Sequence, residues 1–188
     1  MILGLDISTT VIGISIFDEN HKLHEVSYLK FGKDRTLFQK LEDFIDNFKK
    51  YSELEFTSIA IEEPLKKFAG KFSNADTIQR LTQINAMISG FLYLKFNMEP
   101  KYYNVQSARK KAFPNLEIPK SHPNKKYLIW ESVMKAEPTL NWIYNKNGKL
   151  VDENFDMCDA YVVGMAHIVN NIEEKARIKQ TEMSESKK

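Results

Sequence analysis

Residues 2–18, ILGLDISTTVIGISIFD, contain two short apolar segments separated by a small polar turn. The first segment covers residues 2–5, and the second is the β-branched stretch 11–17. Short apolar runs bounded by turn residues are typical of buried strands. Residues 18–21 supply turn chemistry, and residues 24–31 alternate weakly as a third strand. Three strands with short connections predict an antiparallel meander at the start of the chain.

The remainder of the chain mixes helical and strand patterns. Residues 37–48 place apolar side chains at helical spacing, and Asp34 can cap this helix. A fourth strand is predicted over residues 56–62 and a fifth over residues 102–105. Further helices are predicted over residues 73–96 with Ser73 as the cap, over residues 107–112 and 124–136, and from about Phe155 onward. This order predicts an α/β fold with a mixed five-stranded sheet, three antiparallel strands and then parallel strands, flanked by helices on both faces.

The domain organisation follows from length and composition. A chain of 188 residues suits one domain, and the predicted elements occupy residues 1–181. Residues 182–188 are charged and contain serine, which predicts a disordered tail. Asn147 and Gly148, with apolar residues on both sides, predict a hairpin before the last helix.

Several classes of protein are disfavoured by composition. The single cysteine, Cys158, cannot form an intramolecular disulfide, which is compatible with a reducing compartment. No apolar run approaches the roughly 20 residues that a membrane span needs. The first residues lack the basic segment and cleavage site of a signal peptide. We therefore expect a soluble cytoplasmic protein with no membrane partner.

Four acidic residues occur where burial is expected. Asp6 ends the first strand, Glu62 ends the fourth, and Asp156 and Asp159 open the last helix. Residues three apart on a helix lie on one face, so the two aspartates can point to a common place. Each acid has an ordinary interpretation of its own, as a first-turn acid, a strand cap or an edge charge. Buried together they are costly unless a cation compensates, and Mg²⁺ prefers such oxygen ligands.

Three stretches around these acids resemble a known family. ILGLDISTTVIGISIFD resembles the first two strands of RuvC-type Holliday-junction resolvases, and IAIEEP resembles their fourth strand, with Glu62 rather than Glu63 as the acid. DMCDAYVVGMAH resembles their closing helix, including the downstream His167. The segment 141–154 is longer than the family usually has. Phe68, the candidate for an aromatic wedge at the junction centre, is displaced from the strand by the inserted residues Pro64–Lys67.

The resemblance implies an RNase H-like fold and a homodimeric, Mg²⁺-dependent endonuclease that resolves four-way DNA junctions by paired phosphodiester hydrolysis. It implies no small-molecule cofactor, and branched DNA as the partner. Two ions per site are expected, about 3.5–4 Å apart, with Mn²⁺ as a possible substitute. By motif match, the catalytic metal-binding acids are Asp6, Glu62, Asp156 and Asp159.

Basic residues cluster in two segments that could follow a DNA backbone. Any single lysine is ordinarily part of a solvated face, but clustering beside the acids favours phosphate binding. No element is typical of base-specific contacts, so shape and phosphate contacts should dominate. Together with Phe68, the predicted DNA-binding residues are Lys66, Lys67, Lys71, Arg109, Lys110, Lys111, Lys120, Lys125 and Lys126.

Other functions remain open at this level. A non-catalytic nucleic-acid-binding protein of the same fold would have little reason to keep four acids, and a nuclease for RNA–DNA hybrids could use the same acidic site. DISTT, residues 6–10, also resembles the phosphate loop of actin-like ATPases, but those need a second lobe and further glycine-rich motifs. His167 is interpreted as a core histidine, with proton transfer as the alternative, and Cys158 as a packing residue.

Overall fold

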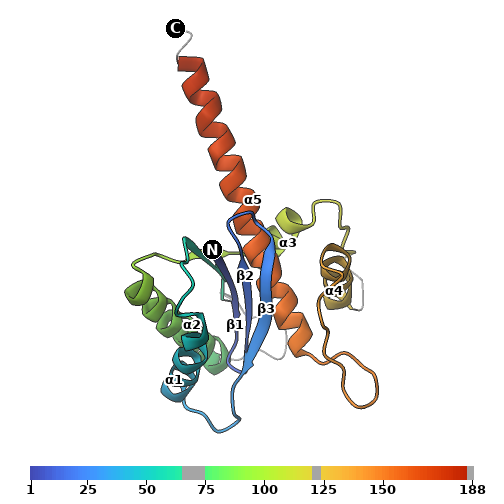
Figure 1. Cartoon of the computed structure of the whole chain (residues 1–188). Coiled ribbons are helices and arrows are strands. Elements are labelled where there is room, and N and C mark those ends of the chain that lie inside the picture. The colour runs from blue at the N-terminus through green and yellow to red at the C-terminus, as the bar shows by residue number, and fades with distance from the viewer. Residues whose placement is uncertain (65–74, 120–123, 186–188) are drawn as a thin grey trace.

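The computed structural model describes residues 1–64, 75–119 and 124–185. Over these residues the chain forms one five-stranded sheet in the order β3-β2-β1-β4-β5. The β1–β2 and β2–β3 pairs are antiparallel, whereas β1–β4 and β4–β5 are parallel. This confirms the predicted mixed sheet (Figure 1). The strands are β1 Ile2–Ile7, β2 Val11–Phe17, β3 Leu23–Lys30, β4 Ser58–Glu62 and β5 Lys101–Tyr103.

Helices cover both faces of the sheet, as predicted (Figure 1). On one face lie α1 and α2, which pack on each other, and on the other face lie α3, α4 and α5. None of the helices within the described residues is long and apolar enough to cross a membrane. The helices are α1 Leu37–Phe48, the short 3-10 turn η1 Lys49–Tyr51, α2 Ala75–Phe96, α3 Val105–Ala112, α4 Lys125–Ala136 and α5 Glu153–Glu185.

The period-two alternation of the strands sorts their side chains between two cores. Leu3 and Leu5 of β1 pack toward α1 and α2, together with Ile59 and Ile61 of β4. Their sequence neighbours face the opposite side, where α5 lies. The last residues of β1 and β4 on that side are acidic rather than apolar. The alternation therefore presents two carboxylates to α5.

Small residues on the sheet let α5 lie directly against the strands. A Cβ atom added at Gly13 would lie 2.0 Å from the backbone oxygen of Asp156, and one added at Gly4 would lie 2.7 Å from that of Ala160. Ser15 is buried and donates a hydrogen bond from its hydroxyl to the Ala160 carbonyl at 2.9 Å. Because no other side chain fits into this space, the position of α5 on the sheet is fixed where its acidic turn begins.

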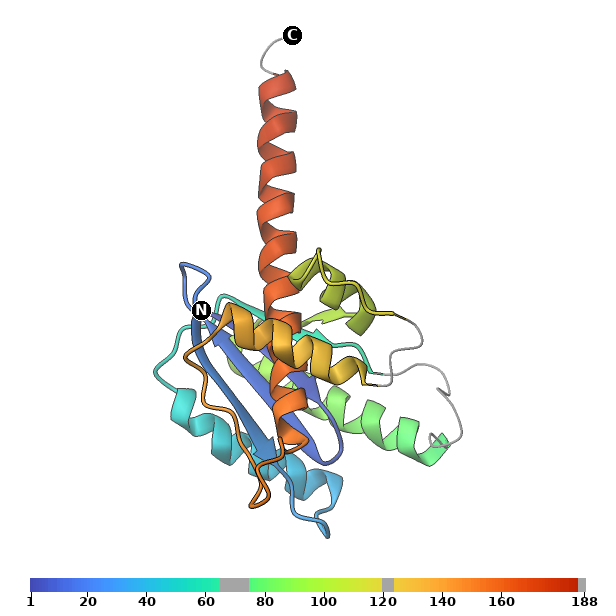
Figure 2. The ribbon, with the colours of Figure 1, turned by 90° about the vertical axis from the view of Figure 1, so that its right-hand side faces the viewer.

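Two of the differences from the sequence predictions concern helix ends. The cap of α1 is Thr36 rather than Asp34: its side chain accepts from the Gln39 amide, while the Gln39 side chain accepts from the Thr36 amide. Reciprocal bonding satisfies two amides, which Asp34, two residues earlier, cannot do. The last helix continues through Glu185 and extends beyond the body of the molecule, so residues 182–185 of the predicted disordered tail are helical (Figure 2).

The predicted hairpin before α5 is present in a minimal form. Tyr144 and Leu150 form an isolated antiparallel bridge, and Gly148 adopts a positive φ of 71°, which a glycine accepts without strain. The buried Asn154 ties this hairpin to α5, because its side chain accepts from the Ile143 amide and donates to the Ile143 carbonyl. The predicted helix cap Ser73 lies outside the described residues.

Candidate metal centre

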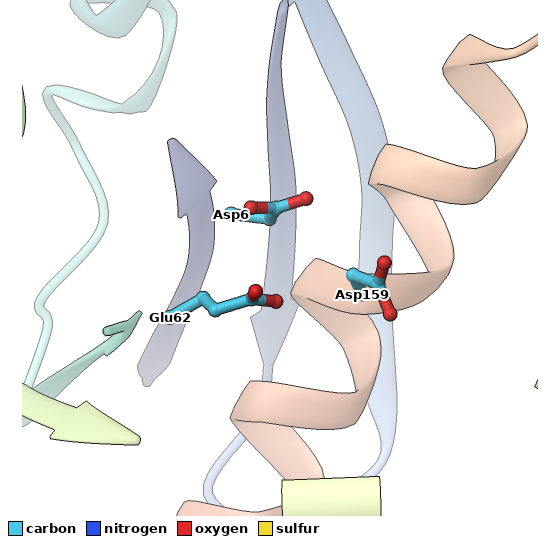
Figure 3. Close-up of side chains that lie close together, drawn as sticks. All are labelled: Asp6, Glu62 and Asp159. Atoms are coloured by element: carbon cyan, nitrogen blue, oxygen red, sulfur yellow. The ribbon is translucent and has the colours of Figure 1, made fainter. Parts of the chain in front are cut away.

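Three carboxylates from separate elements meet at one edge of the sheet. Asp6 lies near the end of β1, Glu62 ends β4, and Asp159 lies in the second turn of α5. Each offers an oxygen, and these oxygens all lie within 4.8 Å of one another. Figure 3 shows the three side chains close together, with Asp6 and Glu62 on the strands pointing toward the helix that carries Asp159. The group can therefore hold a metal ion.

The parallel pairing of β1 and β4 explains why the first two acids meet. Leu5 of β1 lies opposite Ile61 of β4, so the next residue of each strand is an acid at the same edge. Asp6 and Glu62 then face the same side as α5, because their neighbours Leu5 and Ile61 face α1 and α2. The pairing register of β1 and β4 thus brings together two acids, Asp6 and Glu62, that are more than fifty residues apart in the sequence.

The environment of these acids opposes their negative charge. Burial raises the pKa of Asp6 well above its usual range, and the neighbouring Glu62 and Asp159 charges raise it further. Burial and the Asp159 charge likewise raise the pKa of Glu62 to about 8. One oxygen of Glu62, Oε2, is buried without a hydrogen-bond partner. Without a cation, the group is short of positive charge.

Arg109 supplies part of the missing charge. Its Nη2 donates to Oδ1 of Asp159 at 2.8 Å, and the two side chains are only 19% and 12% exposed. Arg109 comes from α3, which packs along α5. Sequence reasoning assigned this arginine to DNA binding from its place in a basic segment. Its ion pair with Asp159 was missed, because no pattern links two residues fifty positions apart.

Asp156 lies outside the group that the other three acids form among the described residues. It occupies the first turn of α5 and is half-buried. Burial raises the pKa of Asp156 to about 6, the Lys126 charge acts to lower it, and the Asp159 charge raises it. Its own charge also raises the pKa values of Asp6 and Glu62. Asp156 therefore affects the other acids through the repulsion between its charge and theirs.

The residues present fit a hard divalent cation. All three ligands are carboxylate oxygens, which Mg²⁺ and similar ions prefer. A cation would offset the repulsion that raises the pKa values of Asp6 and Glu62. It would also give the unpartnered Oε2 of Glu62 a positively charged partner, for which this oxygen would be a ligand. The residues that would hold it are Asp6, Glu62 and Asp159.

The predicted DNA-binding residues fall into three groups. Lys126, at the start of α4, is exposed and close enough for its charge to act on Asp6, Glu62 and Asp156. Lys110 and Lys125 are also exposed, whereas Lys111 is paired with Glu173 of α5 at 2.6 Å. Five candidates lie outside the described residues: Lys66, Lys67, Phe68, Lys71 and Lys120.

His167 and Cys158 are core residues. His167 is fully buried; Nε2 accepts from the Asn171 amide at 3.0 Å, and Nδ1 lies 2.7 Å from the Tyr103 hydroxyl. Burial, with a smaller contribution from the Lys101 charge, lowers the pKa of His167 to about 4. Cys158 is buried, which raises the pKa of its thiol. Neither belongs to the group of metal-ligand atoms found among the described residues.

Comparison with known proteins shows similarity in structure rather than in sequence. No protein-family model matches the chain, and no curated protein is similar to it in sequence. The structure is similar to Thermus thermophilus RuvC in complex with Holliday junction substrate, with a TM-score of 0.62 and 8% identity over 92% of this chain and 94% of that one. The low identity limits the similarity to the fold. The high coverage shows that this similarity extends over nearly the whole chain.

Two further resolvases from distant organisms give the same result. The yeast mitochondrial Holliday junction resolvase Ydc2 matches with a TM-score of 0.59 and 11% identity over 89% of this chain and 77% of that one. The Fowlpox virus resolvase, in complex with Holliday junction DNA, matches with a TM-score of 0.52 and 14% identity over 91% and 97% of the two chains. The mixed five-stranded sheet of this protein, with its flanking helices, has the RNase H-like fold of the Holliday-junction resolvases.

Proposed function

We propose that this protein is a metal-dependent, structure-selective DNA endonuclease that resolves four-way or otherwise branched DNA. The observation that carries the proposal is the meeting of Asp6, Glu62 and Asp159, with an unpartnered Glu62 oxygen among them. The resolvase fold supports the substrate, since two of the similar structures contain Holliday junction DNA. Mg²⁺ is the proposed ion, and two ions per site would suit phosphodiester cleavage.

In this proposal the acidic residues bind the ion, and the basic residues balance the charge. A bound divalent ion lowers the pKa of a water molecule and stabilises charge on phosphate oxygens. Asp6, Glu62 and Asp159 would hold it in the ionised form. Arg109 fixes Asp159 through Oδ1, which leaves the second oxygen for the ion. Lys126, exposed at the rim, would attract the phosphate and offset the negative charge beside the acids.

Symmetric cleavage of a junction needs two sites. Within the described part of this chain there is one group of acids with this geometry. Paired hydrolysis of two strands by one bound assembly therefore requires a second copy. We include a homodimer in the proposal for this reason.

A non-catalytic DNA-binding protein of the same fold is the second candidate, and the Arg109–Asp159 ion pair favours it. A guanidinium on one acid can replace a metal ion as the balancing charge. The unpartnered Oε2 of Glu62 argues against it, because one arginine leaves the group unbalanced. A test for DNA cleavage therefore distinguishes the nuclease from the non-catalytic DNA-binding protein.

Incubation with labelled four-way, forked, linear duplex and RNA–DNA hybrid substrates tests the proposal. With Mg²⁺ the parent protein should cut the branched DNA, and EDTA should stop it. Asp6→Asn should slow cleavage at least ~100-fold, since a ligand and its charge are lost, while junction binding is retained. Junction binding without cutting by the parent in Mg²⁺ or Mn²⁺ would establish the non-catalytic candidate. Selective cutting of the hybrid would assign a different substrate.

A further inference from the structure

A groove with a strongly basic lining lies beside the acidic group. It encloses about 630 Å³ between the turn after β1, the start of α1 and the middle of α2. Four of its ten lining residues are cationic and one is anionic. We name it the basic groove, and its residues used below are Thr9, Lys33, Arg35, Lys40, Arg80 and Gln83. None of these was predicted from sequence to contact DNA.

The basic groove is fixed in position relative to the acids. Thr9 follows Asp6 by three residues, so the two Cα atoms lie within about 10 Å of each other. Lys40 of α1 donates to the Thr9 carbonyl at 2.7 Å, which joins one wall to the turn. Asn85 of α2 is buried and donates to the Ile7 carbonyl at 3.2 Å, which joins the other wall to the same strand end. The distance corresponds to about three nucleotide steps of 3.4 Å along DNA.

Two cations of the groove are available to a ligand. Arg35 is paired with Asp43 at 3.0 Å, and Lys40 is held by the Thr9 carbonyl. Lys33 and Arg80 are exposed, and no carboxylate of the described ranges lies within ion-pair distance of either. The Thr9 hydroxyl and the Gln83 amide add hydrogen-bond donors to the lining. Free cations with neutral donors form a lining suited to phosphate oxygens.

The opposite end of the sheet is rich in carboxylates. A larger cavity, of about 930 Å³, opens there beside Ile2, at the start of the strand whose other end carries Asp6. Five carboxylates line it, among them Glu55 and Glu99, against two lysines, Lys101 and Lys175. The carboxylates of that cavity repel a polyanion, whereas the cations of the basic groove attract one.

Positive charge flanks the acids on both sides of the sheet. The basic groove is lined by residues of α1 and α2, and Lys126 belongs to α4. These helices lie on opposite sides of the sheet (Figure 1). The sheet and its helices separate these two sites, and the acids lie between them at the strand ends. A branched DNA can place one arm against each side, with its branch point near the acids.

We propose that the basic groove binds the phosphodiester backbone of one arm of a branched DNA, while the α4 side binds another arm across the acidic group. The inference rests on the proposed nuclease function and adds a reason for its selectivity. A straight duplex that follows one side leaves the other side empty. A branched substrate gains phosphate contacts on both.

The test replaces the two available cations, Lys33→Ala with Arg80→Ala, and measures binding of a labelled four-way junction and a linear duplex by anisotropy in EDTA. Junction affinity should fall about tenfold at 0.15 M salt, and the log–log salt dependence should become shallower by about 2, one unit per phosphate contact. Duplex affinity should change by less than about threefold. A Lys101→Ala, Lys175→Ala variant removes the same charge at the acidic cavity and should bind both DNAs like the parent.

The outcomes separate the groove from the nuclease. Unchanged junction affinity and salt dependence in the Lys33→Ala, Arg80→Ala variant would overturn the groove proposal, while junction cleavage by the parent would leave the nuclease in place. Equal losses for junction and duplex would overturn the selection between arms. A parent protein that neither binds nor cuts any of the DNAs would overturn the proposed function and the groove together.

Discussion

Arg109 is the basic residue that forms an ion pair within the acidic group. Its guanidinium binds Asp159 in a largely buried position, beside Asp6 and Glu62. Burying four charges with only one of them positive is unfavourable, which explains the raised pKa values of Asp6 and Glu62. A metal ion and Arg109 would therefore act in the same direction. Each partly replaces the charge that the other supplies.

Replacing Arg109 tests this shared role. Arg109→Ala should lower the free energy of unfolding by about 3 kcal/mol in EDTA, because a buried ion pair loses one partner. The loss should be smaller in saturating Mg²⁺, since binding of the ion stabilises the folded state and restores positive charge. Lys110→Ala, at the exposed neighbouring position, should have little effect in either condition. Chemical denaturation with and without Mg²⁺ measures both, and an equal loss in the two conditions would contradict the shared role.

At the scale of elements, the contact between α5 and the sheet places the acids. Gly4 and Gly13 leave no room for a side chain beneath the helix, and Ser15 bonds to its backbone. The oxygen nearest to Gly13 belongs to Asp156, one turn before Asp159. A shift of the helix at this point would carry Asp159 away from Asp6 and Glu62. The glycine is therefore part of the geometry of the site.

Gly13→Ala should disturb both stability and cleavage. The added methyl would overlap the Asp156 carbonyl at 2.0 Å, so α5 must move, at a cost of about 3 kcal/mol. Junction cleavage should fall by more than the loss of folded protein accounts for. Gly90→Ala, in α2, is the matched control: nothing lies within 4 Å of its added Cβ, and it should stabilise the protein by up to about 1 kcal/mol. Unimpaired cleavage by folded Gly13→Ala would show that the close approach is not needed.

At the scale of the whole molecule, α5 extends from the candidate metal centre to the acidic cavity at the other end of the sheet. Its first turns carry the acids of the candidate metal centre, and His167, about 12 Å further along the helix, lines the acidic cavity at the other end. Because Nε2 of His167 accepts from Asn171, Nδ1 carries the proton of the neutral ring and donates to the Tyr103 hydroxyl. A second proton on Nε2 would face the Asn171 amide. The folded molecule therefore requires the neutral histidine.

His167 should make global stability depend on pH. The folded pKa of about 4 lies below the ordinary 6.5, so the unfolded chain binds more protons between these values. The contribution of His167 to the free energy of unfolding should be greatest above pH 6.5 and should fall by about 3 kcal/mol as the pH drops to 4. Urea unfolding of the parent and of His167→Gln across this range measures the difference, in which the contributions of other titrating groups cancel. Parallel pH profiles for the two proteins would contradict it.

Much of the candidate site followed from local patterns. Asp6, Glu62 and Asp159 were predicted as ligands because acids at strand ends and in an early helical turn interrupt apolar runs. Asp156 was predicted with them, since helical spacing places it on the same face; it lies outside the group of three, and its role as a ligand stays a prediction. Lys111 was predicted to contact DNA, which stays a prediction, and no sequence pattern indicated its ion pair with Glu173. The spacing of residues along a helix predicts which face a side chain lies on, but it does not predict which residue of another element that side chain contacts.

By itself, the sequence determined the order of strands and helices and the mixed sheet, and it supplied four candidate acids, because hydrophobic periodicity and turn chemistry act over a few residues. Only the tertiary structure decided the Arg109–Asp159 ion pair, the close seat of α5 on Gly13 and the basic groove between α1 and α2. These features join side chains that are far apart in the chain. Their energies depend on the distances and burial that packing creates, and no local pattern encodes those quantities.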